Sequence, residues 1–476
     1  MEYQFAGAML CLLLDLGRRY YGRARQYVVA AVGTASLLAS LVTLIINFRT
    51  SGSQTTQISP ALSPLGNLYV VDRFGLLIIL TILIIGVAVT IYSSFYFGKD
   101  ENAGPFFSLL LILVTSCIGV VSSGDFLTLF LFWEGMSISA YALVAFRKRQ
   151  QLSLEAALKY LFLAGVGTLV FLFGVALFYS VVGSIQYSVV PMILIQDPQL
   201  GLFSMLMMIV GLGVEAAIFP MQTWLPDAYG VAPVPVSAFL SGVVTETAVF
   251  AILKLAEPII FSSTTGNSIL TGVQITLAIL AVLTMFAGNL GALAQTNLRR
   301  MLAFSSISQV GYMIAAISTF SVTGLVAVVF HIWNQGLVKS NFFMLTGADK
   351  SEYEENELEG MKGLGQQERT LGVLYASSSL AMVGSPPFGM FWSELLILQS
   401  VLAVGSTTFY ALAGFLLLNI LLSITYYFRI LNTTALSHGP ERKAKMVTAL
   451  ILIPFVLLLL SLLTGILPSI ILRIIT

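Results

Sequence analysis

The sequence predicts an all-α polytopic membrane protein, and three observations lead to this fold class. Of the 476 residues, 57% are hydrophobic and 9% are charged, which leaves too few polar side chains to cover a soluble globule of this size. Several apolar runs exceed the roughly 20 residues that an α-helix needs to cross a bilayer core. The sequence also lacks the alternating segments of about ten residues that form membrane β-barrels. A soluble enzyme is therefore excluded.

Charge clusters and loops rich in Gly, Pro or Ser divide the chain into about 14 candidate membrane helices. They cover approximately residues 4–15, 26–47, 73–96, 105–122, 125–146, 156–182, 202–223, 235–256, 268–294, 299–318, 321–347, 371–400, 406–432 and 445–472. The first stretch follows the acidic Glu2 and lacks a small-residue cleavage pattern, so we expect a short span and not a signal peptide. The segment 50–70 is rich in Ser, Thr, Gln and Pro and is predicted to be an irregular connection.

The distribution of Lys and Arg predicts the orientation of these helices. Of 23 such residues, 17 lie in odd-numbered loops or at the helix ends beside them. Three lie on the opposite side, namely Arg49, Arg73 and Arg473. Because positive charge is retained in the cytoplasm, we expect the odd loops inside and both termini outside, in the plasma membrane of a prokaryotic cell. The inside loop near 348–370 is strongly acidic, and we interpret it as a solvated loop rather than a docking site.

The composition also bears on cofactors and nucleic acid. The net charge is +1 without a basic block, so nothing indicates a nucleic-acid partner. Cys11 and Cys117 both lie in apolar stretches, where buried free thiols are expected, and they cannot form a Cys-rich metal or iron–sulfur site. His331 and His438 lie far apart in the sequence and give no metal-ligand spacing. We therefore expect no cofactor, metal site or catalytic residue in this chain.

Ionisable side chains within the apolar helices are the candidate functional groups. Lys339 and His331 lie well inside predicted spans, and Lys159 and Lys254 lie nearer to helix ends. Four acids join them, each on a different helix: Glu134, Glu215, Glu246 and Glu394. Each charge costs about 2.5–3.5 kcal/mol at the bilayer centre on insertion scales. Pairing between packed helices could explain any one of these residues, but four acids on four helices exceed what packing requires.

Two of the acids lie beside helix-breaking prolines. Glu215 lies five residues before Pro220, and Glu394 lies seven residues after Pro387, which follows Pro386. Proline removes a backbone hydrogen bond and frees carbonyl groups, which is tolerated at membrane depth only where protein or water satisfies them. Broken helices beside ionisable groups are typical of ion pathways through transporters. The alternative for each proline is a simple kink in a packed helix.

His331, Gln335 and Lys339 are spaced by four residues in HIWNQGLVKSNFF. This spacing places them along one face of a helix over roughly 12 Å. A lone buried His is often a satisfied core residue, but a polar stripe of this kind can carry a chain of water. The stripe therefore favours a proton relay.

These segments together resemble the antiporter-like membrane subunits shared by respiratory complex I, Mrp-type cation/proton antiporters and membrane-bound energy-converting hydrogenases. The resemblance extends from about residue 70 to 430. The segments that carry it are FLFWEGMSISAYALVAF, FPMQTWLPDAYGVAPVPVSAFLSG, NLRRMLAFSSISQVGYM, HIWNQGLVKSNFFMLTG and GSPPFGMFWSELL. They are similar, in order, to the family's fifth helix, broken seventh helix with the start of the eighth, tenth, eleventh and broken twelfth helices.

The resemblance implies a specific architecture. The family has fourteen helices with two inverted five-helix repeats, helices 4–8 and 9–13, and each repeat contains one broken helix and half of a proton route. The implied domains are 1–104, 105–256, 257–432 and 433–476, which hold helices 1–3, the first repeat, the second repeat and helix 14. By position, Glu134 and the seventh-helix residue would form a first ion pair. Lys339 would be a central relay group, and Glu394 would be the exit-side acid.

The chain departs from the family pattern at three of these positions. Glu215 and Glu246 stand where most relatives have lysine on the seventh and eighth helices, and Gln335 stands where relatives often have a second histidine. Glu134 facing Glu215 would place two carboxylates in a low-dielectric site, where one of them has to hold a proton. This half-site could store a proton on an acid, hold Na⁺, or be inactive in pumping. We expect retained proton conduction with this inverted charge arrangement.

The predicted function is a proton-translocating subunit of a redox-driven ion pump, with coupling to Na⁺ as an open alternative. The sequence contains no Cys cluster or Rossmann fingerprint, so other subunits must handle the electrons. We expect antiporter-like and small helical membrane subunits as partners, together with lipids and, through those subunits, a redox arm with iron–sulfur clusters. The alternatives are a subunit of a redox-free Mrp-type Na⁺/H⁺ antiporter and a structural spacer subunit that conducts nothing.

Overall fold

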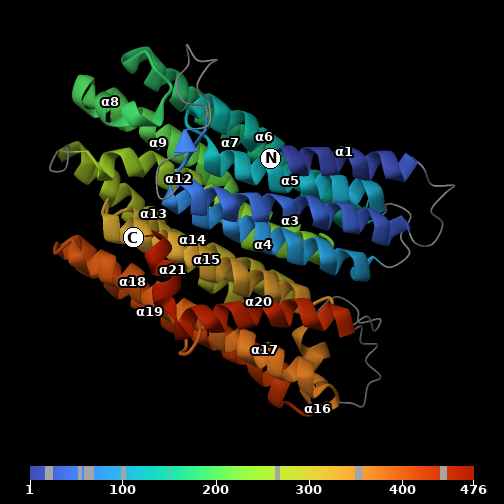
Figure 1. Cartoon of the computed structure of the whole chain (residues 1–476). Helices are drawn as coiled ribbons and strands as arrows, with labels where there is room; N and C mark the ends of the chain where they lie inside the picture. The colour runs from blue at the N-terminus through green and yellow to red at the C-terminus, as the bar shows by residue number, and fades with distance from the viewer. Residues whose placement is uncertain are drawn as a thin grey trace.

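The computed structural model describes residues 1–16, 25–51, 56–57, 69–97, 103–147, 150–262, 268–348, 357–439 and 448–475. These residues form a bundle of helices, most of which lie side by side along a common direction (Figure 1). The strands found in this part of the chain are β1 (Thr56–Gln57) and β2 (Val70–Val71), which pair antiparallel. The predicted all-α class is confirmed. Many of the loop cations that predict the orientation, and the acidic residues at 349–356, lie outside the described residues.

The first half of the bundle runs from the N-terminus to the helix that ends at Ile260. Its helices are α1 (Glu2–Leu16), α3 (Arg25–Ser51), α4 (Arg73–Tyr96), α5 (Ala103–Ser122), α6 (Phe126–Val144), α7 (Gln151–Val182), α8 (Val190–Gln196), α9 (Pro198–Glu215), α10 (Trp224–Val231), α11 (Val234–Phe239) and α12 (Thr245–Ile260). A π-helical turn, Leu240–Val244, joins α11 to α12. A 3₁₀ turn, Tyr187–Val189, precedes α8.

The second half occupies the other side of the bundle in Figure 1. Its helices are α13 (Ser268–Leu293), α14 (Leu298–Ile317), α15 (Val322–Leu345), α16 (Leu364–Gln367), α17 (Arg369–Met382), α18 (Gly389–Ala403), α19 (Thr407–Leu431), α20 (Thr448–Ile466) and α21 (Pro468–Ile475). A 3₁₀ turn, Leu358–Met361, precedes α16, and a π turn, Asn432–Leu436, follows α19.

Helix is present in all the predicted ranges, but three of them are not continuous helices. The range 202–223 is helical to Glu215 and then breaks, 371–400 breaks between Met382 and Gly389, and 445–472 breaks after Ile466. Ten helices of the described part are long and apolar enough to cross a membrane. α14 and α15 are also long, but they carry many buried polar side chains, which lowers their hydropathy.

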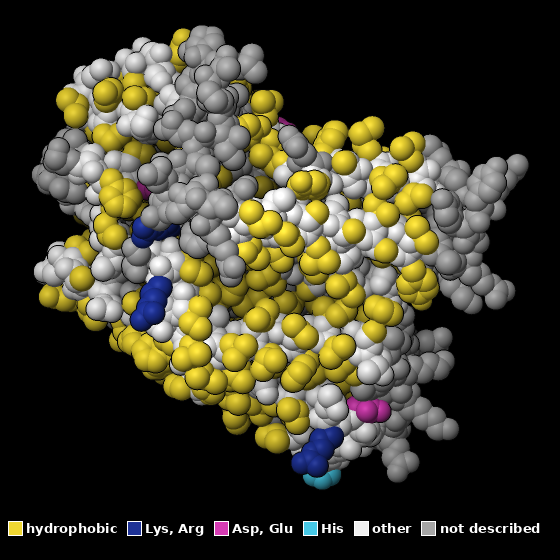
Figure 2. All heavy atoms as spheres, in the orientation of Figure 1, with side chains coloured by type: hydrophobic (Ala, Val, Ile, Leu, Met, Phe, Trp, Pro, Cys, Tyr) yellow, Lys and Arg dark blue, Asp and Glu magenta, His cyan; other side chains and the backbone are white. Residues whose placement is uncertain are grey.

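Burial separates central from peripheral helices. The segment Val234–Ile260 is enclosed by protein except near its C-terminal end, and nearly all of α15 is buried. The peripheral helices α7, α13 and α19 instead expose large apolar side chains, such as Phe162, Ile279 and Leu421. Figure 2 shows one such apolar face, on which charged side chains lie towards the ends of the helices. An apolar exterior around a polar centre is what a lipid-embedded bundle requires.

The termini of several helices are fixed by side-chain caps. Asp72 accepts a hydrogen bond from the backbone N–H of Gly75 at the start of α4 (2.6 Å), and Asp125 accepts one from Thr128 at the start of α6 (2.8 Å). Such caps satisfy N–H groups that have no partner within the helix. Cys11 and Cys117 are free and buried, as predicted.

Candidate ion-translocation site

The first broken helix ends at Glu215. The chain turns through residues 216–223, where Ala217 has a positive φ of 57°, and resumes as α10 at Trp224. Groups freed by the break are bonded to the surrounding protein, since Phe219 N donates to Thr284 Oγ1 (3.1 Å) and Trp224 Nε1 donates to Val214 O (2.8 Å). Pro220 lies within this break and is exposed on the lateral surface. The break predicted from the proline is present.

The second broken helix has the same construction. Pro386 and Pro387 lie between the end of α17 at Met382 and the start of α18 at Gly389, and both are exposed. Gly384 adopts a positive φ of 72° in this segment. A Cβ atom at Gly384 would lie 2.5 Å from Oε2 of Glu394. Glycine is therefore required here both by the backbone conformation and by the approach of this carboxyl group.

Glu215 is 1% exposed and is bound by a tyrosine that the sequence reasoning did not identify. The hydroxyl of Tyr160 on α7 donates a hydrogen bond to its Oε1, and Oε2 has no hydrogen-bond partner within the described part of the chain. Glu134 on α6 lies close enough to interact electrostatically with Glu215. Its own Oε1 accepts a hydrogen bond from Thr168 of α7 (2.7 Å).

The family pattern implies an ion pair at this position, and the structure instead places two acids there. Each carboxyl group is bound by a hydroxyl of α7, and the two hydroxyl residues, Tyr160 and Thr168, lie eight residues apart on that helix. The reason for the difference is the residue type at 215, since Glu cannot supply the positive charge that Lys would. The available sequence signal was the spacing of eight residues between two hydroxyl side chains on this helix.

The middle of the molecule contains Glu246 and Lys339. Glu246 is the second residue of α12, just after the π turn, and is 1% exposed. Neither of its carboxyl oxygens has a hydrogen-bond partner among the described residues. It interacts electrostatically with Lys339 of α15, which is fully buried. Lys339 Nζ donates to Leu302 O (3.1 Å), to Tyr427 OH (3.3 Å) and to Ser305 Oγ. A buried lysine of the second half therefore interacts electrostatically with a buried acid of the first half.

Glu394 lies on the far side of Lys339 and is 8% exposed. Gln309 Nε2 lies 3.5 Å from its Oε1, at the limit of a hydrogen bond. Three buried phenols interact with this acid: Tyr312, Tyr426 and Tyr427. Because Tyr427 also accepts the hydrogen bond from Lys339, it connects the central lysine to the environment of Glu394. The adjacent tyrosines at 426 and 427 in an apolar helix were the sequence signal for this connection.

The remaining predicted site residues are divided between the interior and the ends of the helices. His331 Nδ1 lies 3.0 Å from Ser393 Oγ, next to Glu394 in sequence, and its Nε2 has no partner in the described structure. Gln335 is fully buried on the same helix, and neither polar atom of its side chain is bonded to the described residues. These unbonded polar atoms belong to the stripe that the spacing predicts.

Lys159 does not lie in the buried row. Its Nζ forms an ion pair with Asp227 of α10 (2.6 Å), and Arg300 of α14 binds the other oxygen of Asp227 (2.9 Å). All three side chains are between 31% and 41% exposed. The position of Lys159 therefore favours an ion-paired role near a helix end over a relay role within the membrane. Lys254 lies at the opposite end of the bundle and is buried.

In sum, the structure brings four predicted acids and one lysine into a row that crosses both halves. The order is Glu134 and Glu215, then Glu246 and Lys339, then Glu394, with tyrosines at both ends of the row. Carboxyl, amine and phenol groups can all accept and release protons, and water can bridge unbonded buried polar atoms between them. The arrangement is suited to moving protons through an otherwise apolar molecule.

Comparison with known proteins identifies the family. Residues 123–420 match the family model described as "NADH:quinone oxidoreductase/Mrp antiporter, TM". NADH-quinone oxidoreductase subunit N of Methylovorus glucosotrophus is 30% identical over 432 residues, which cover 89% of this chain and 85% of that protein. The subunit N 1 of Koribacter versatilis is 32% identical over 391 residues, which cover 79% and 74%.

Three solved structures share the fold. A chain of the membrane-bound sulfane sulfur reductase, an archaeal respiratory membrane complex, matches with a TM-score of 0.88 and 26% identity, covering 100% of this chain and 95% of that one. A chain of respiratory complex I from Thermus thermophilus matches with a TM-score of 0.79, 24% identity and 98% coverage of both chains. A chain of the Mrp complex from Dietzia matches with a TM-score of 0.84 and 20% identity, covering 100% and 96%.

The last two likenesses concern the fold alone, whereas the family model and the subunit N relatives also fix the family. The chain is an all-helical, multi-pass membrane protein with the antiporter-like fold of complex I. It belongs to the NADH:quinone oxidoreductase/Mrp antiporter family and is an antiporter-like subunit similar to NADH-quinone oxidoreductase subunit N.

Proposed function

We propose that this chain translocates protons as one subunit of a multi-subunit, redox-driven pump of the complex I or membrane-bound hydrogenase type. The observation that carries the proposal is the buried row from Glu215 through Glu246 and Lys339 to Glu394. Uncompensated ionisable groups are costly at membrane depth, so a row of them without full hydrogen bonding indicates a transport function. The relatives are subunits of an NADH-quinone oxidoreductase, which supports a redox-driven complex.

We infer that the fold consists of fourteen spans with two five-helix repeats. Ten spans are the apolar helices. The polar helices α14 and α15, the short helix α1 and the pair α17–α18, taken as one broken span, bring the number to fourteen. Residues 105–256 and 257–432 would be the repeats, flanked by 1–104 and 433–476. Each break then falls in the fourth helix of its repeat. An odd number of spans per repeat makes the second repeat enter the membrane from the opposite side, which is the basis of inversion.

The proposed orientation places odd-numbered loops in the cytoplasm of a prokaryotic cell and both termini outside. Lys159, Asp227 and Arg300 come from segments next to three different odd loops and meet at one end of the bundle, which supports a common side for those loops. Antiporter-like and small helical subunits are the proposed neighbours, with an iron–sulfur redox arm reached through them. The exposed breaks at Pro220 and at Pro386 and Pro387 lie on lateral surfaces that such neighbours or lipids would cover.

In the proposed mechanism the first half-site stores a proton on an acid. Glu134 and Glu215 each have a hydroxyl of α7 as a hydrogen-bond partner, so a proton added to either acid remains within a bonded group. Glu246 and Lys339 exchange protons at the centre, and Lys339 exchanges protons with Glu394 through the hydroxyl of Tyr427. Each transfer passes one proton from an acidic group to a basic one. Water would complete the transfers at Glu246 and Gln335, where the protein offers no partner in the described structure.

The test uses the intact complex, isolated from membranes and reconstituted in liposomes with a pH-sensitive dye inside. The electron donor is the one among NADH, reduced ferredoxin and hydrogen that the isolated complex oxidises. Lys339→Ala is expected to abolish proton translocation per electron while the complex still assembles. Lys362→Ala is the matched control, because Lys362 lies on a half-exposed loop and pairs only locally with Glu359. Unchanged translocation in Lys339→Ala would show that the chain is a structural spacer.

Two further measurements address the alternatives. Glu215→Gln should lower translocation, and an unchanged value would show that the first half-site is inactive. If translocation requires Na⁺ in the medium, the transported ion is Na⁺ and not H⁺. Isolation with small membrane subunits and without any iron–sulfur subunit would instead indicate a redox-free antiporter.

A further inference from the structure

A second group of ionisable side chains lies outside the central row, where three helix ends meet. Asp72 caps the start of α4, Asp125 caps the start of α6, and Glu257 lies in the last turn of α12. The bridges that hold these ends together pair Tyr69 with Ser123 and Asp125 with Gln186. The three acids come from distant parts of the chain, and each of them interacts electrostatically with one buried amine, that of Lys254.

Lys254 is 7% exposed and is held on two sides. Its Nζ donates a hydrogen bond to Ser123 O (2.5 Å) and lies 5.3 Å from the centre of the Tyr187 ring. The hydroxyls of Ser123 and Tyr187 are 3.0 Å apart, so the amine, the serine and the tyrosine form one contact group. Lys254 also interacts electrostatically with Asp72, Glu257 and Asp125.

Asp72 and Glu257 differ from Asp125 in exposure and in their contact with each other. Their carboxyl groups lie within hydrogen-bonding distance of one another, and both residues are half-buried. A carboxylate offers only acceptors, so two carboxyl groups in such contact must share a proton. Asp125 is 1% exposed, and both of its oxygens are occupied by Thr128. The pair Asp72–Glu257 is thus a proton-holding group near the surface, whereas Asp125 is buried and bonded to Thr128.

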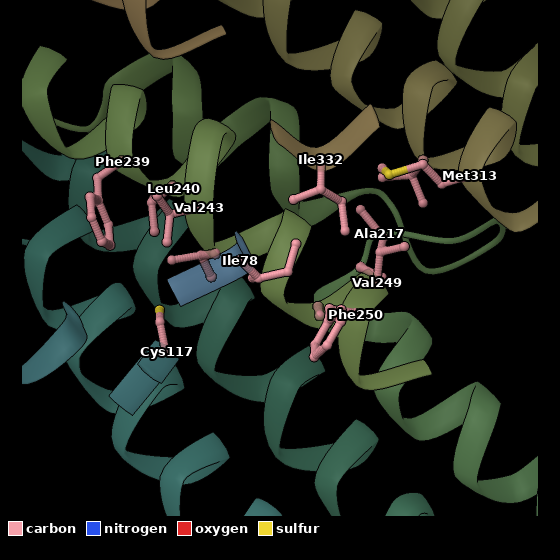
Figure 3. Packing of buried hydrophobic residues seen from close by; sticks show 14 of the residues in the cluster. Ile78, Cys117, Ala217, Phe239, Leu240, Val243, Val249, Phe250, Met313 and Ile332 are labelled. Atoms are coloured by element: carbon pink, nitrogen blue, oxygen red, sulfur yellow. The ribbon is translucent and has the colours of Figure 1, made fainter. Parts of the chain in front are cut away.

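Helix α12 connects this cluster to the central row. Glu246, Phe250, Lys254 and Glu257 recur on one side of the helix, and Glu246 and Glu257 are about 16 Å apart along its axis. Val249 and Phe250, which lie between Glu246 and Lys254 on α12, belong to the buried apolar packing of the bundle (Figure 3). Glu246 and Lys254 therefore lie at the two ends of a short apolar segment of α12. This segment keeps the two groups separate in this conformation.

We propose that Lys254 and the Asp72–Glu257 carboxyl pair form a proton terminal, through which the central row exchanges protons with the aqueous phase at this end of the bundle. This inference rests on the proposed proton translocation. In the outward direction the pair releases its shared proton to water and the Lys254 ammonium group returns a proton to it. Lys254 then regains a proton from the Glu246 side along water that enters past Phe250. Only protons move, and no bond between heavier atoms changes.

A purely structural role would require less than the cluster contains. Capping α4 needs one side-chain acceptor, which Asp72 supplies to Gly75, and asparagine caps a helix as well as aspartate does. Asparagine can also donate a hydrogen bond to Glu257, so the contact between the helices survives in Asp72→Asn. What asparagine cannot do is exchange a proton. This substitution therefore separates the two roles without removing the cap.

The experiment compares Asp72→Asn with Asp197→Asn in the reconstituted complex. Asp197 is also an N-cap aspartate, bonded to Leu200 N (3.1 Å) at the start of α9, and it serves as the matched control. The quantity measured is proton translocation per electron, with electron-transfer rate and thermal stability of the complex recorded beside it. We expect Asp72→Asn to lose most of the translocation at an unchanged stability, and Asp197→Asn to keep it.

Two additional variants keep the inference testable if Asp72→Asn assembles poorly. Glu257→Gln should reproduce the loss, and Glu257→Asp, which retains an exchangeable proton, should restore part of it. Normal translocation in both Asp72→Asn and Glu257→Gln would overturn the proton terminal, whatever the result for Lys339→Ala. If Lys339→Ala itself translocates normally, the proposed function fails instead, so the two failures are distinguishable.

Discussion

The ring of Tyr160 lies flat on the indole of Trp224, with ring centroids 3.9 Å apart and planes at 6° to one another. Trp224 is the first residue of α10, and Tyr160 donates its hydroxyl to Glu215, the last residue of α9. One tyrosine therefore binds both sides of the first helix break. The hydrogen bond from Tyr160 holds Glu215 beside this stack, and Trp224 Nε1 also donates to Val214 O across the break.

Tyr160→Phe should slow proton transfer through Glu215 while leaving the fold intact, because phenylalanine keeps the stack and removes only the hydroxyl. A hydrogen bond to a charged group is worth about 1.5–3 kcal/mol, so the step is expected to slow by about tenfold or more. The measurement is translocation per electron in liposomes. Tyr179→Phe on the same helix is the control, since Tyr179 is 55% exposed. Equal behaviour of the two variants would contradict a role for Tyr160.

Gly384→Ala should impair function more than stability. Gly384 and Gly405 share a positive φ, 72° and 74°, so alanine at either position costs about 1–2 kcal/mol in backbone strain. At Gly405 a Cβ atom meets nothing within 4 Å, whereas at Gly384 it would displace the Glu394 carboxyl group. We expect similar melting temperatures for the two variants and a loss of translocation only in Gly384→Ala. Normal translocation in Gly384→Ala would show that the position of Glu394 is not critical.

The adjacent arginines at the start of α14 should differ in their effect on stability. Arg299 is 6% exposed and binds Tyr229 O (2.8 Å), Ser237 Oγ (2.7 Å) and Ala232 O, which ties the end of α10 to α14. Arg299→Ala removes three hydrogen bonds from a charged donor, at a cost of about 1.5–3 kcal/mol each, although Tyr229 O keeps the hydrogen bond that Ser237 Oγ donates to it. Arg300→Ala removes a half-exposed ion pair worth about 0–1 kcal/mol. Thermal unfolding of the complex measures both, and only the small effect of Arg300→Ala should depend on salt.

Phe250→Ala should make the membrane leaky to protons in the absence of electron transfer. Removing the ring opens space between Glu246 and Lys254, and a buried Phe→Ala change costs about 3–5 kcal/mol in stability. The leak is measured as the decay of an imposed pH gradient in liposomes. Phe107→Ala on α5 is the control, because Phe107 is equally buried (1% exposed) and lies near the start of α5, at the other end of this helix from Ser123 and Lys254. If both variants leak protons equally, the leak comes from general loosening of the bundle and not from the loss of the Phe250 ring.

Helix positions were predictable because burial in lipid imposes a local rule on the sequence. The predicted range 73–96 is α4, and 268–294 differs from α13 by one residue. The acids Glu134, Glu215, Glu246 and Glu394 were also evident, because a carboxylate is unusual in an apolar run whatever surrounds it. The prolines predicted both breaks. The predicted range 202–223 nevertheless extends past Glu215, where α9 ends.

The partners of those acids were not predictable, because they lie on other helices. Tyr160 meets Glu215 and Thr168 meets Glu134 only because α7 packs between them, and Tyr427 reaches Lys339 from a helix far along the chain. The same applies to Asp72 and Glu257, which in sequence are an ordinary N-cap and a helix-end acid. Hydropathy acts on each residue separately and so determined the helices and their buried charges. Hydrogen bonds require two groups at a fixed distance, and only the packing of the helices decided which groups those are.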